Sequence, residues 1–210
     1  RRQRQMCIRD RLPIVECYIG TKWDYMGEKT VIVTRQHPQG HFTMGVYLVD
    51  IYCKGLLHSE YFFNMNHDDY EMMVKRIDMD EDLKKAAYAD AHKLVYGAID
   101  FAEAVGIDSE DSFDITKYIL DEKKEEIPFA EFGRNGKHYL RADTDEEAEL
   151  YIPIIMEAIG TDFTYSIEGV TDGEVDAAEV PFGDFDFSEL NYDEEEFDKM
   201  FEKLNRESQD

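Results

Sequence analysis

Two stretches of apolar and β-branched residues predict a β-hairpin near the start of the chain. Thr30–Gln36 and Phe42–Cys53 are strand-like, and they flank a loop at 37–41 that contains turn-forming Pro and Gly. Met44–Val49 is almost continuously apolar, which favours a central strand buried on both faces. Two shorter strands are predicted at Pro13–Ile19 and Glu60–Asn64.

The middle of the chain has helical periodicity. Asp68–Ile77 predicts a short helix, and Glu81–Val105 predicts a long one that Gly106 would end. Small residues dominate the apolar stripe of the long helix, which would let its backbone lie close to a sheet. The stripe consists of Ala87, Ala91, Leu94, Ala98, Ala102 and Val105. A third helix is predicted at Ser109–Lys123, with Phe113, Ile119 and Leu120 as its apolar positions.

A second hairpin is predicted later in the chain. Strands at Phe129–Gly133 and Lys137–Ala142 flank Arg134-Asn135-Gly136, in which Asn-Gly supplies the positive φ angles of a tight turn.

A further helix is expected to begin in the acidic segment 143–147, whose charges suit the positive end of a helix dipole. Pro153 should kink this helix or mark its restart, because proline lacks the N–H that a helix interior needs. Asp162–Glu168 is the last predicted strand.

These patterns predict an α+β fold, with a mixed or antiparallel sheet packed against a long helix rich in small residues. Residues 12–170 are expected to form one domain, followed by an acidic tail at 171–210. About 200 residues with 43% hydrophobic content are ample for a real core.

The tail has a different composition from the domain. It carries fifteen acidic residues against Lys199, Lys203 and Arg206, which leaves too little apolar surface for an independent fold. Asn191 can cap a terminal helix with one apolar face. The candidate partner-binding residues are the tail aromatics Phe182, Phe185, Phe187, Phe197 and Phe201. They suit a basic, apolar groove on a partner; alternatively, the tail is solvated and its last helix folds back on its own domain.

Residues 1–10 equal one reading frame of a transposase-type sequencing adapter, and Arg11 fits the partial codon that would follow. We therefore interpret residues 1–11 as translated adapter and exclude them from fold reasoning, which places the natural start upstream and suggests an environmental DNA source. A genuine basic, anion-binding arm would require a ten-residue coincidence.

The remaining chain is strongly acidic. The full chain has a net charge of -25, and residues 1–11 carry five Arg and one Asp, or +4, so residues 12–210 carry -29. Such a field repels nucleic-acid phosphates and anionic membranes and favours a basic protein partner. Cys17 and Cys53 form no CxxC pair, which favours a reducing, cytoplasmic location. No apolar run approaches the roughly 20 residues that span a bilayer.

Candidate chemistry is confined to a few polar positions, because no phosphate-loop, dinucleotide or metalloprotease motif is present and no cofactor is expected. Asp50 ends the apolar strand, where a carboxylate must be paired, solvated or functional. It is either a catalytic group or a cap for the turn at Lys54-Gly55. His37 and His41 flank one turn, but nothing supplies the other ligands of a zinc site, so no metal is expected.

Three further residues complete the candidate catalytic set. Cys53 is a nucleophile if a base or positive charge lies nearby, and otherwise a small core residue. His92 lies beside the small-residue stripe of the predicted long helix; it is either a general base or metal ligand, or a half-buried side chain bonded to backbone. Lys137 follows the second predicted turn.

Three motifs resemble a family of bacterial proteins of unknown function. They are Gly45-Val46-Tyr47-Leu48-Val49-Asp50 with Cys53 and Gly55, Ala91-His92 with Leu94-Val95-Tyr96-Gly97-Ala98, and Phe132-Gly133 with Gly136-Lys137. In that family Val-Lys follows the glycine of the first motif and Asn follows the histidine of the second, whereas this chain has Leu56, Leu57 and Lys93. The resemblance covers roughly residues 12–142 and implies a shared fold without a known chemistry.

Two hypotheses of function follow from the sequence. The first is a cytosolic binding or adaptor protein whose acidic surface and aromatic tail engage a basic protein partner. The second is a hydrolase that uses Asp50 and His92 as an acid–base pair, with Cys53 or Lys137 nearby. Nucleic-acid binding by a local basic face is a third reading, and we expect none.

Overall fold

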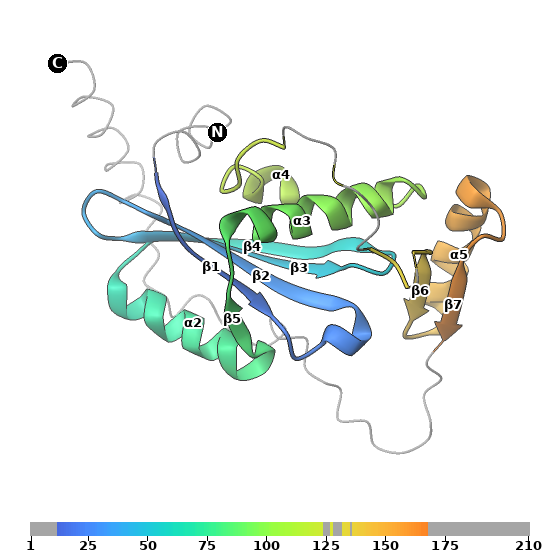
Figure 1. Ribbon diagram of the computed structural model, residues 1–210, viewed down its shortest axis with the longest axis horizontal. Helices are drawn as coiled ribbons and strands as arrows, with labels where there is room; N and C mark the ends of the chain where they lie inside the picture. Colours follow the sequence, from blue (N-terminus) through green and yellow to red (C-terminus); the bar gives the residue numbers. More distant parts are fainter. Residues whose placement is uncertain (1–11, 124–126, 128–131, 135, 168–210) are drawn as a thin grey trace. The chain divides into compact units, whose positions relative to one another are not determined.

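The computed structural model describes residues 12–123, 127, 132–134 and 136–167, all within one compact unit of the chain (Figure 1). Its fold is α+β. In chain order the elements are β1 (Ile14–Gly20), the short 3-10 helix η1 (Asp24–Met26), β2 (Glu28–Gln36), β3 (Phe42–Asp50), β4 (Gly55–Met65), α2 (His67–Glu81), β5 (Leu83–Lys85), α3 (Tyr88–Glu103), α4 (Phe113–Thr116), β6 (Tyr139–Ala142), α5 (Asp145–Ile159) and β7 (Thr164–Ile167).

The first five strands form one antiparallel sheet in the order β4-β3-β2-β1-β5. β2 and β3 pair without interruption from Glu28↔Asp50 to Gln36↔Phe42, and the turn closes with a 2.8 Å hydrogen bond from the His37 amide to the His41 carbonyl. The predicted first hairpin is therefore confirmed. β4 is longer than the predicted strand because its pairing with β3 begins directly after the turn.

Helices cover both faces of this sheet (Figure 1). Val31 and Val33 of β2 pack with Val95 of α3 in one cluster. On the opposite face, the Tyr70 hydroxyl of α2 lies 3.3 Å from the Thr34 hydroxyl. Coverage on both sides explains why β2 and β3 read as continuous apolar runs.

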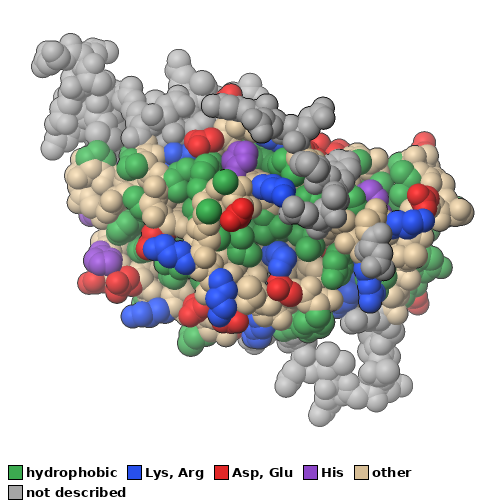
Figure 2. Space-filling model, in the orientation of Figure 1, with side chains coloured by type: hydrophobic (Ala, Val, Ile, Leu, Met, Phe, Trp, Pro, Cys, Tyr) green, Lys and Arg blue, Asp and Glu red, His purple; other side chains and the backbone are tan. Residues whose placement is uncertain are grey.

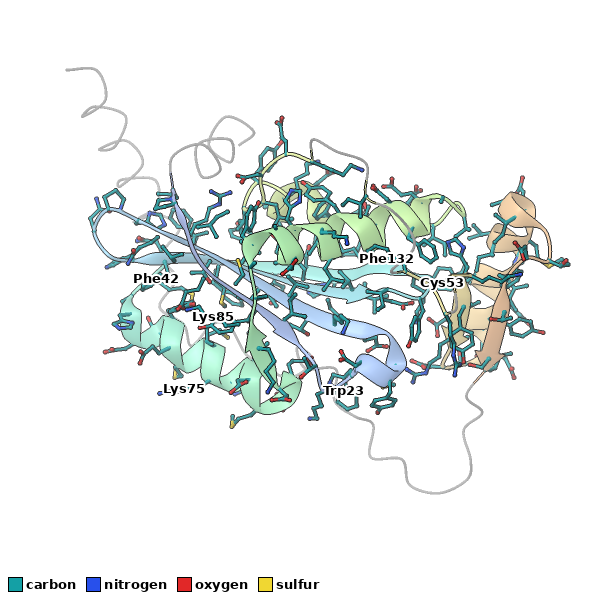
Figure 3. The ribbon with its side chains drawn as sticks, viewed as in Figure 1. Trp23, Phe42, Cys53, Lys75, Lys85 and Phe132 are labelled. Atoms are coloured by element: carbon teal, nitrogen blue, oxygen red, sulfur yellow. The ribbon has the colours of Figure 1, made fainter. Side chains whose placement is uncertain are left out.

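The prediction of one long helix at Glu81–Val105 is wrong at the start of that helix. Helix α2 extends to Glu81, and Asp82 then adopts a left-handed backbone with φ of 49°. The next three residues form β5, which pairs with the edge of β1 through Ile19↔Lys84 and Tyr18↔Lys85 (Figure 3). Periodicity cannot reveal this break, because the free backbone edge of β1, and not a local pattern, draws the segment into the sheet. Helix α3 begins only at Tyr88.

The helix predicted at Ser109–Lys123 is reduced to the single turn of α4. The Tyr47 hydroxyl donates a 2.8 Å hydrogen bond to the Thr116 carbonyl, which a continuing helix would use for the amide four residues later. Ser59 of β4 also bonds the hydroxyls of Ser112 and Thr116. These contacts hold α4 against the sheet, and the chain after α4 continues with hydrogen bonds three residues apart, such as that from the Ile119 amide to the Thr116 carbonyl.

The C-terminal part contains β6, α5 and β7. Thr144 caps α5 by accepting a hydrogen bond from the Glu147 amide, which confirms the predicted helix start. The helix continues through Pro153, so the predicted restart is wrong. This proline is exposed, where a freed carbonyl can reach water.

The predicted second hairpin is only partly present. An isolated antiparallel bridge joins Arg134 and Lys137, but β6 pairs in parallel with β7 and not with an earlier strand. Most of the strand predicted at Phe129–Gly133 lies outside the described residues. Among the helices that the structure describes, none is long and apolar enough to cross a membrane.

Candidate binding surface and the predicted catalytic residues

Asp50 closes the turn between β3 and β4. Its carboxylate accepts hydrogen bonds from the backbone amides of Tyr52 (2.7 Å) and Lys54 (2.9 Å), and the residue is 3% exposed. Burial raises the pKa of this carboxyl, and the amide hydrogen bonds oppose the rise. Gly55 ends the turn with φ of 74°, a conformation that favours glycine. Asp50 thus has the turn-capping position that was one of its two readings.

Cys53 is completely buried at the junction with the C-terminal part (Figure 3). It packs in a cluster with Ala102, Leu140 and Ile155. Burial, together with the nearby charge of Asp50, raises the pKa of the thiol to about 12. Only the thiolate is a nucleophile, so these surroundings keep Cys53 protonated at neutral pH.

His92 belongs to a separate polar cluster near α4. Its Nε2 lies 3.0 Å from the Asp121 carbonyl oxygen, to which the ring N–H can donate, and its ring contacts those of Tyr88 and Tyr96. The buried Arg35 forms a 2.8 Å ion pair with the Asp121 carboxylate. These contacts attach the segment after α4 to the sheet and to α3.

The four candidate catalytic residues do not come together. Cys53 packs against Ala102 of α3, and His92 precedes Ala102 by ten residues, or about 15 Å along a helix. Lys137 is exposed and forms an ion pair with an acidic residue before β7. General acid–base catalysis needs groups within hydrogen-bond reach of one substrate atom. The geometry gives no support to a pair of Asp50 and His92.

An ionic network that the sequence did not predict joins the sheet to the C-terminal part. Lys54 Nζ lies 2.9 Å from Glu147 Oε1 in the first turn of α5. Arg141 of β6 lies 3.8 Å from Glu28 at the start of β2. Burial raises the pKa of Glu28, and Lys54 and Arg141 oppose that rise. Lys54 and Glu147 are 93 residues apart, so no local spacing could reveal the pair.

The described side chains give no support to a metal site or to a nucleic-acid interface. Within the described ranges, no group of three or more His, Cys, Asp and Glu residues could hold a metal ion. On the face shown in Figure 2, described Lys and Arg side chains are interspersed with Asp and Glu. Nucleic-acid binding proteins instead cluster their cations along one face.

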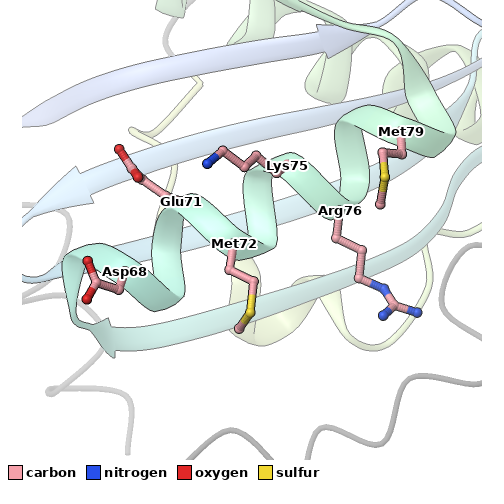
Figure 4. Close-up of a pocket in the computed structure, with 6 residues that line it drawn as sticks. All are labelled: Asp68, Glu71, Met72, Lys75, Arg76 and Met79. Atoms are coloured by element: carbon pink, nitrogen blue, oxygen red, sulfur yellow. The ribbon is translucent and has the colours of Figure 1, made fainter.

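A shallow pocket of about 450 Å³ lies on the outer side of α2 (Figure 4). Met72 and Met79 give it an apolar character, and both side chains are more than half exposed. Its charges are mixed: Asp68 and Glu71 lie toward the helix start, and Lys75 and Arg76 follow them. Mixed charge of this kind selects for neither a basic nor an acidic partner.

Helix α5 also leaves apolar side chains in contact with solvent. Of its fifteen residues only Ala148 and Ile155 are buried, although apolar residues occur around most of its circumference. Leu150 is 59% exposed and Met156 is 48% exposed. An all-round apolar helix is normally enclosed by other elements. Tyr151, Ile152, Ile154 and Ile159 pack against the buried cluster of Cys53, whereas Leu150 and Met156 remain exposed.

β7 extends the exposed apolar area. Tyr165 is 55% exposed and Ile167 is 38% exposed. The register places them beside Leu140 and Ala142 of β6, which are completely buried. Side chains of laterally paired residues point to the same side of a sheet, so α5 covers β6 and leaves the same face of β7 partly bare. We call Leu150, Met156, Tyr165 and Ile167 the C-terminal apolar surface.

Acidic residues accompany this surface. The sequence of α5 contains five acidic residues and no Lys or Arg. One of them, Glu147, pairs with Lys54; the other four, Asp145, Glu146, Glu149 and Glu157, are exposed. Unlike the α2 pocket, helix α5 therefore combines exposed apolar side chains with charged side chains of a single sign.

The tail aromatics predicted to bind a partner, Phe182, Phe185, Phe187, Phe197 and Phe201, lie outside the described residues. Comparison of the chain with protein-family models, with curated proteins and with solved structures found no match. The resemblance to a bacterial family of unknown function stays a prediction, so any function must be inferred from the chain's own surfaces.

Proposed function

We propose that this protein is a cytosolic binding or adaptor protein that engages a basic protein partner through its acidic surface and tail. The observation that carries the proposal is the C-terminal apolar surface, where exposed apolar residues accompany four unpaired acids of α5. Tyr165 and Ile167 share one face of β7, and exposed apolar residues grouped in this way, with polar surroundings, are typical of protein–protein interaction sites. The chain's net charge of -25 selects for a partner of the opposite sign.

The tail supplies the second half of the proposal. Its fifteen acids and its aromatic side chains combine long-range attraction with apolar anchors. Aromatic residues are common at the energetic centres of protein interfaces, whereas exposed charges act mainly on association rate and specificity.

Defined peptides test this proposal on the full chain. We would measure the fluorescence anisotropy of three labelled peptides of about twelve residues each. One peptide alternates Lys with Val, the second alternates Glu with Val, and the third alternates Lys with Ser. The Lys–Val peptide should bind best, and added salt should weaken it as the screening length falls from about 10 Å at 0.1 M to about 3 Å at 1 M. Equal binding of the Glu–Val peptide would refute a basic partner.

Alanine substitution of the five tail aromatics in the full chain isolates the role of the tail. Weaker binding of the Lys–Val peptide is expected. The matched control replaces Met72 and Met79 of α2, which are exposed apolar residues with mixed-charge neighbours. If the tail variant binds like this control, the tail has no part in the interaction.

The hydrolase hypothesis has less support, because its two principal residues lie in separate clusters and contact backbone groups. Turnover of a model ester or phosphoester that disappears in Asp50→Asn and His92→Ala variants of unchanged stability would restore it.

A further inference from the structure

The two-stranded sheet of β6 and β7 has one edge without a described strand. The Thr164 amide donates a 3.0 Å hydrogen bond to the His138 carbonyl, so Thr164 turns its peptide groups toward β6. Successive residues of a strand direct these groups to opposite sides. The amide and carbonyl groups of Tyr165 and Ile167 therefore point away from β6, and no described residue pairs with them.

The same two residues carry the exposed apolar side chains of β7. Tyr165 and Ile167 are on the α5 side of the sheet, next to completely buried residues of β6. The Tyr165 ring lies 6.2 Å from that of Phe163, which packs against the buried cluster under α5. An added strand would pair with the outward peptide groups, and its apolar side chains would extend this cluster.

Charge decides what kind of strand fits. A second copy of the chain would bring another -25 charges to a surface whose helix already has four exposed acids. An extended segment with Lys or Arg on its other face avoids this repulsion. Strand addition also obtains affinity from main-chain hydrogen bonds and specificity from alternate side chains.

We propose that β7 accepts a third strand from the basic partner, a segment in which apolar residues alternate with Lys or Arg. This inference rests on the proposed function, because the inference specifies where on the domain the basic partner binds and which conformation it adopts there. Its apolar side chains lie against Tyr165 and Ile167, and its basic side chains project from the opposite face of the sheet toward solvent.

Paired substitutions at Ile167 test the outward hydrogen bond. Ile167→Ala removes the side chain, whereas Ile167→Pro also removes the outward N–H and leaves the hydrogen bonds to β6 intact. Proline is tolerated on edge strands where its N–H would face solvent. Against the alternating Lys–Val peptide, the Pro variant should bind about fivefold more weakly than the Ala variant, the effect of one net hydrogen bond.

A second peptide with the same Lys and Val content arranged in two blocks separates this inference from the proposed function. Preference for the alternating peptide, together with its loss in Ile167→Pro, supports strand addition. Equal binding of both peptides, unaffected by Ile167→Pro, would leave a basic partner but overturn strand addition at β7. Failure of every basic peptide to bind the wild-type chain would overturn both proposals.

Amide hydrogen exchange on the full chain keeps the test informative if Ile167→Pro disturbs folding. The Tyr165 and Ile167 amides should exchange quickly in the free protein and slow at least tenfold with the alternating peptide. Protection without peptide would mean that another segment or a second copy already occupies the edge, and would overturn the inference. Sedimentation then distinguishes a dimer from an intrachain contact.

Discussion

The sheet region, residues 12–123, and the C-terminal region, residues 136–167, use apolar residues in different ways. In β2, six consecutive residues are buried, and helices cover both faces. In β7 none of the four residues is buried, and α5 buries two of fifteen. The difference teaches where stability and binding should be sought: the first region encloses its apolar surface, and the second leaves part of its apolar surface exposed.

The largest expected difference between the two regions is in the free energy of unfolding that is lost when an apolar side chain is truncated. Ile32 of β2 is completely buried, so Ile32→Ala should lower the free energy of unfolding by about 2–5 kcal/mol. Leu150→Ala on α5 should change it by less than about 0.5 kcal/mol, because most of that side chain already contacts water. Urea unfolding measures both. A large cost for Leu150→Ala would mean that α5 is already covered, and would break the comparison.

Acid should act mainly on the sheet region, through His37. Its imidazole is buried at the β2–β3 turn with Nε2 2.8 Å from the Thr43 hydroxyl. Burial, with a smaller contribution from the charge of His41, lowers its pKa from 6.5 to about 4. The folded protein thus disfavours protonation, so stability from neutral His37 is complete above pH 6.5 and is lost as pH falls toward 4. The loss is about 3 kcal/mol at most.

Unfolding free energies at pH 7 and pH 4.5 test this for wild type and His37→Gln. Other groups titrate in both proteins, so the informative quantity is the smaller loss expected in the variant. The matched control is the same substitution at His138, in the connection to β6, because burial lowers the pKa of that imidazole as well. If His37→Gln and wild type lose the same stability, His37 does not control the acid response.

The smallest expected effect concerns the ion pair between the two regions. Lys54 and Glu147 are mostly shielded from solvent, and their charged atoms are 2.9 Å apart. Burial lowers the pKa of Lys54, but the hydrogen bond and charge of Glu147 more than reverse this. A double-mutant cycle with Lys54→Met and Glu147→Gln should give a coupling of about 1 kcal/mol. Zero coupling would mean that this ion pair does not help to join the regions.

The fold was predictable wherever one local pattern determined one element. Apolar alternation located β1, β2 and β3, and Thr144 with its acidic neighbours located the start of α5. The candidate site was harder to predict from the sequence. Asp50 and His92 were predicted to act as an acid–base pair, but they lie in separate clusters. The exposure of Tyr165 and Ile167 depends on how far α5 extends over β7.

The sequence by itself determined the β2–β3 hairpin, the acidic field and an α5 with more apolar residues than one face requires. These properties depend on side-chain periodicity and charge, which are local. Only the tertiary structure decided that residues 83–85 join β1, that Tyr47 takes the Thr116 carbonyl from a longer helix, and that β6 pairs in parallel with β7. Each of these outcomes depends on which backbone groups distant segments leave unpaired, and a buried polar group must find a partner wherever the fold provides one.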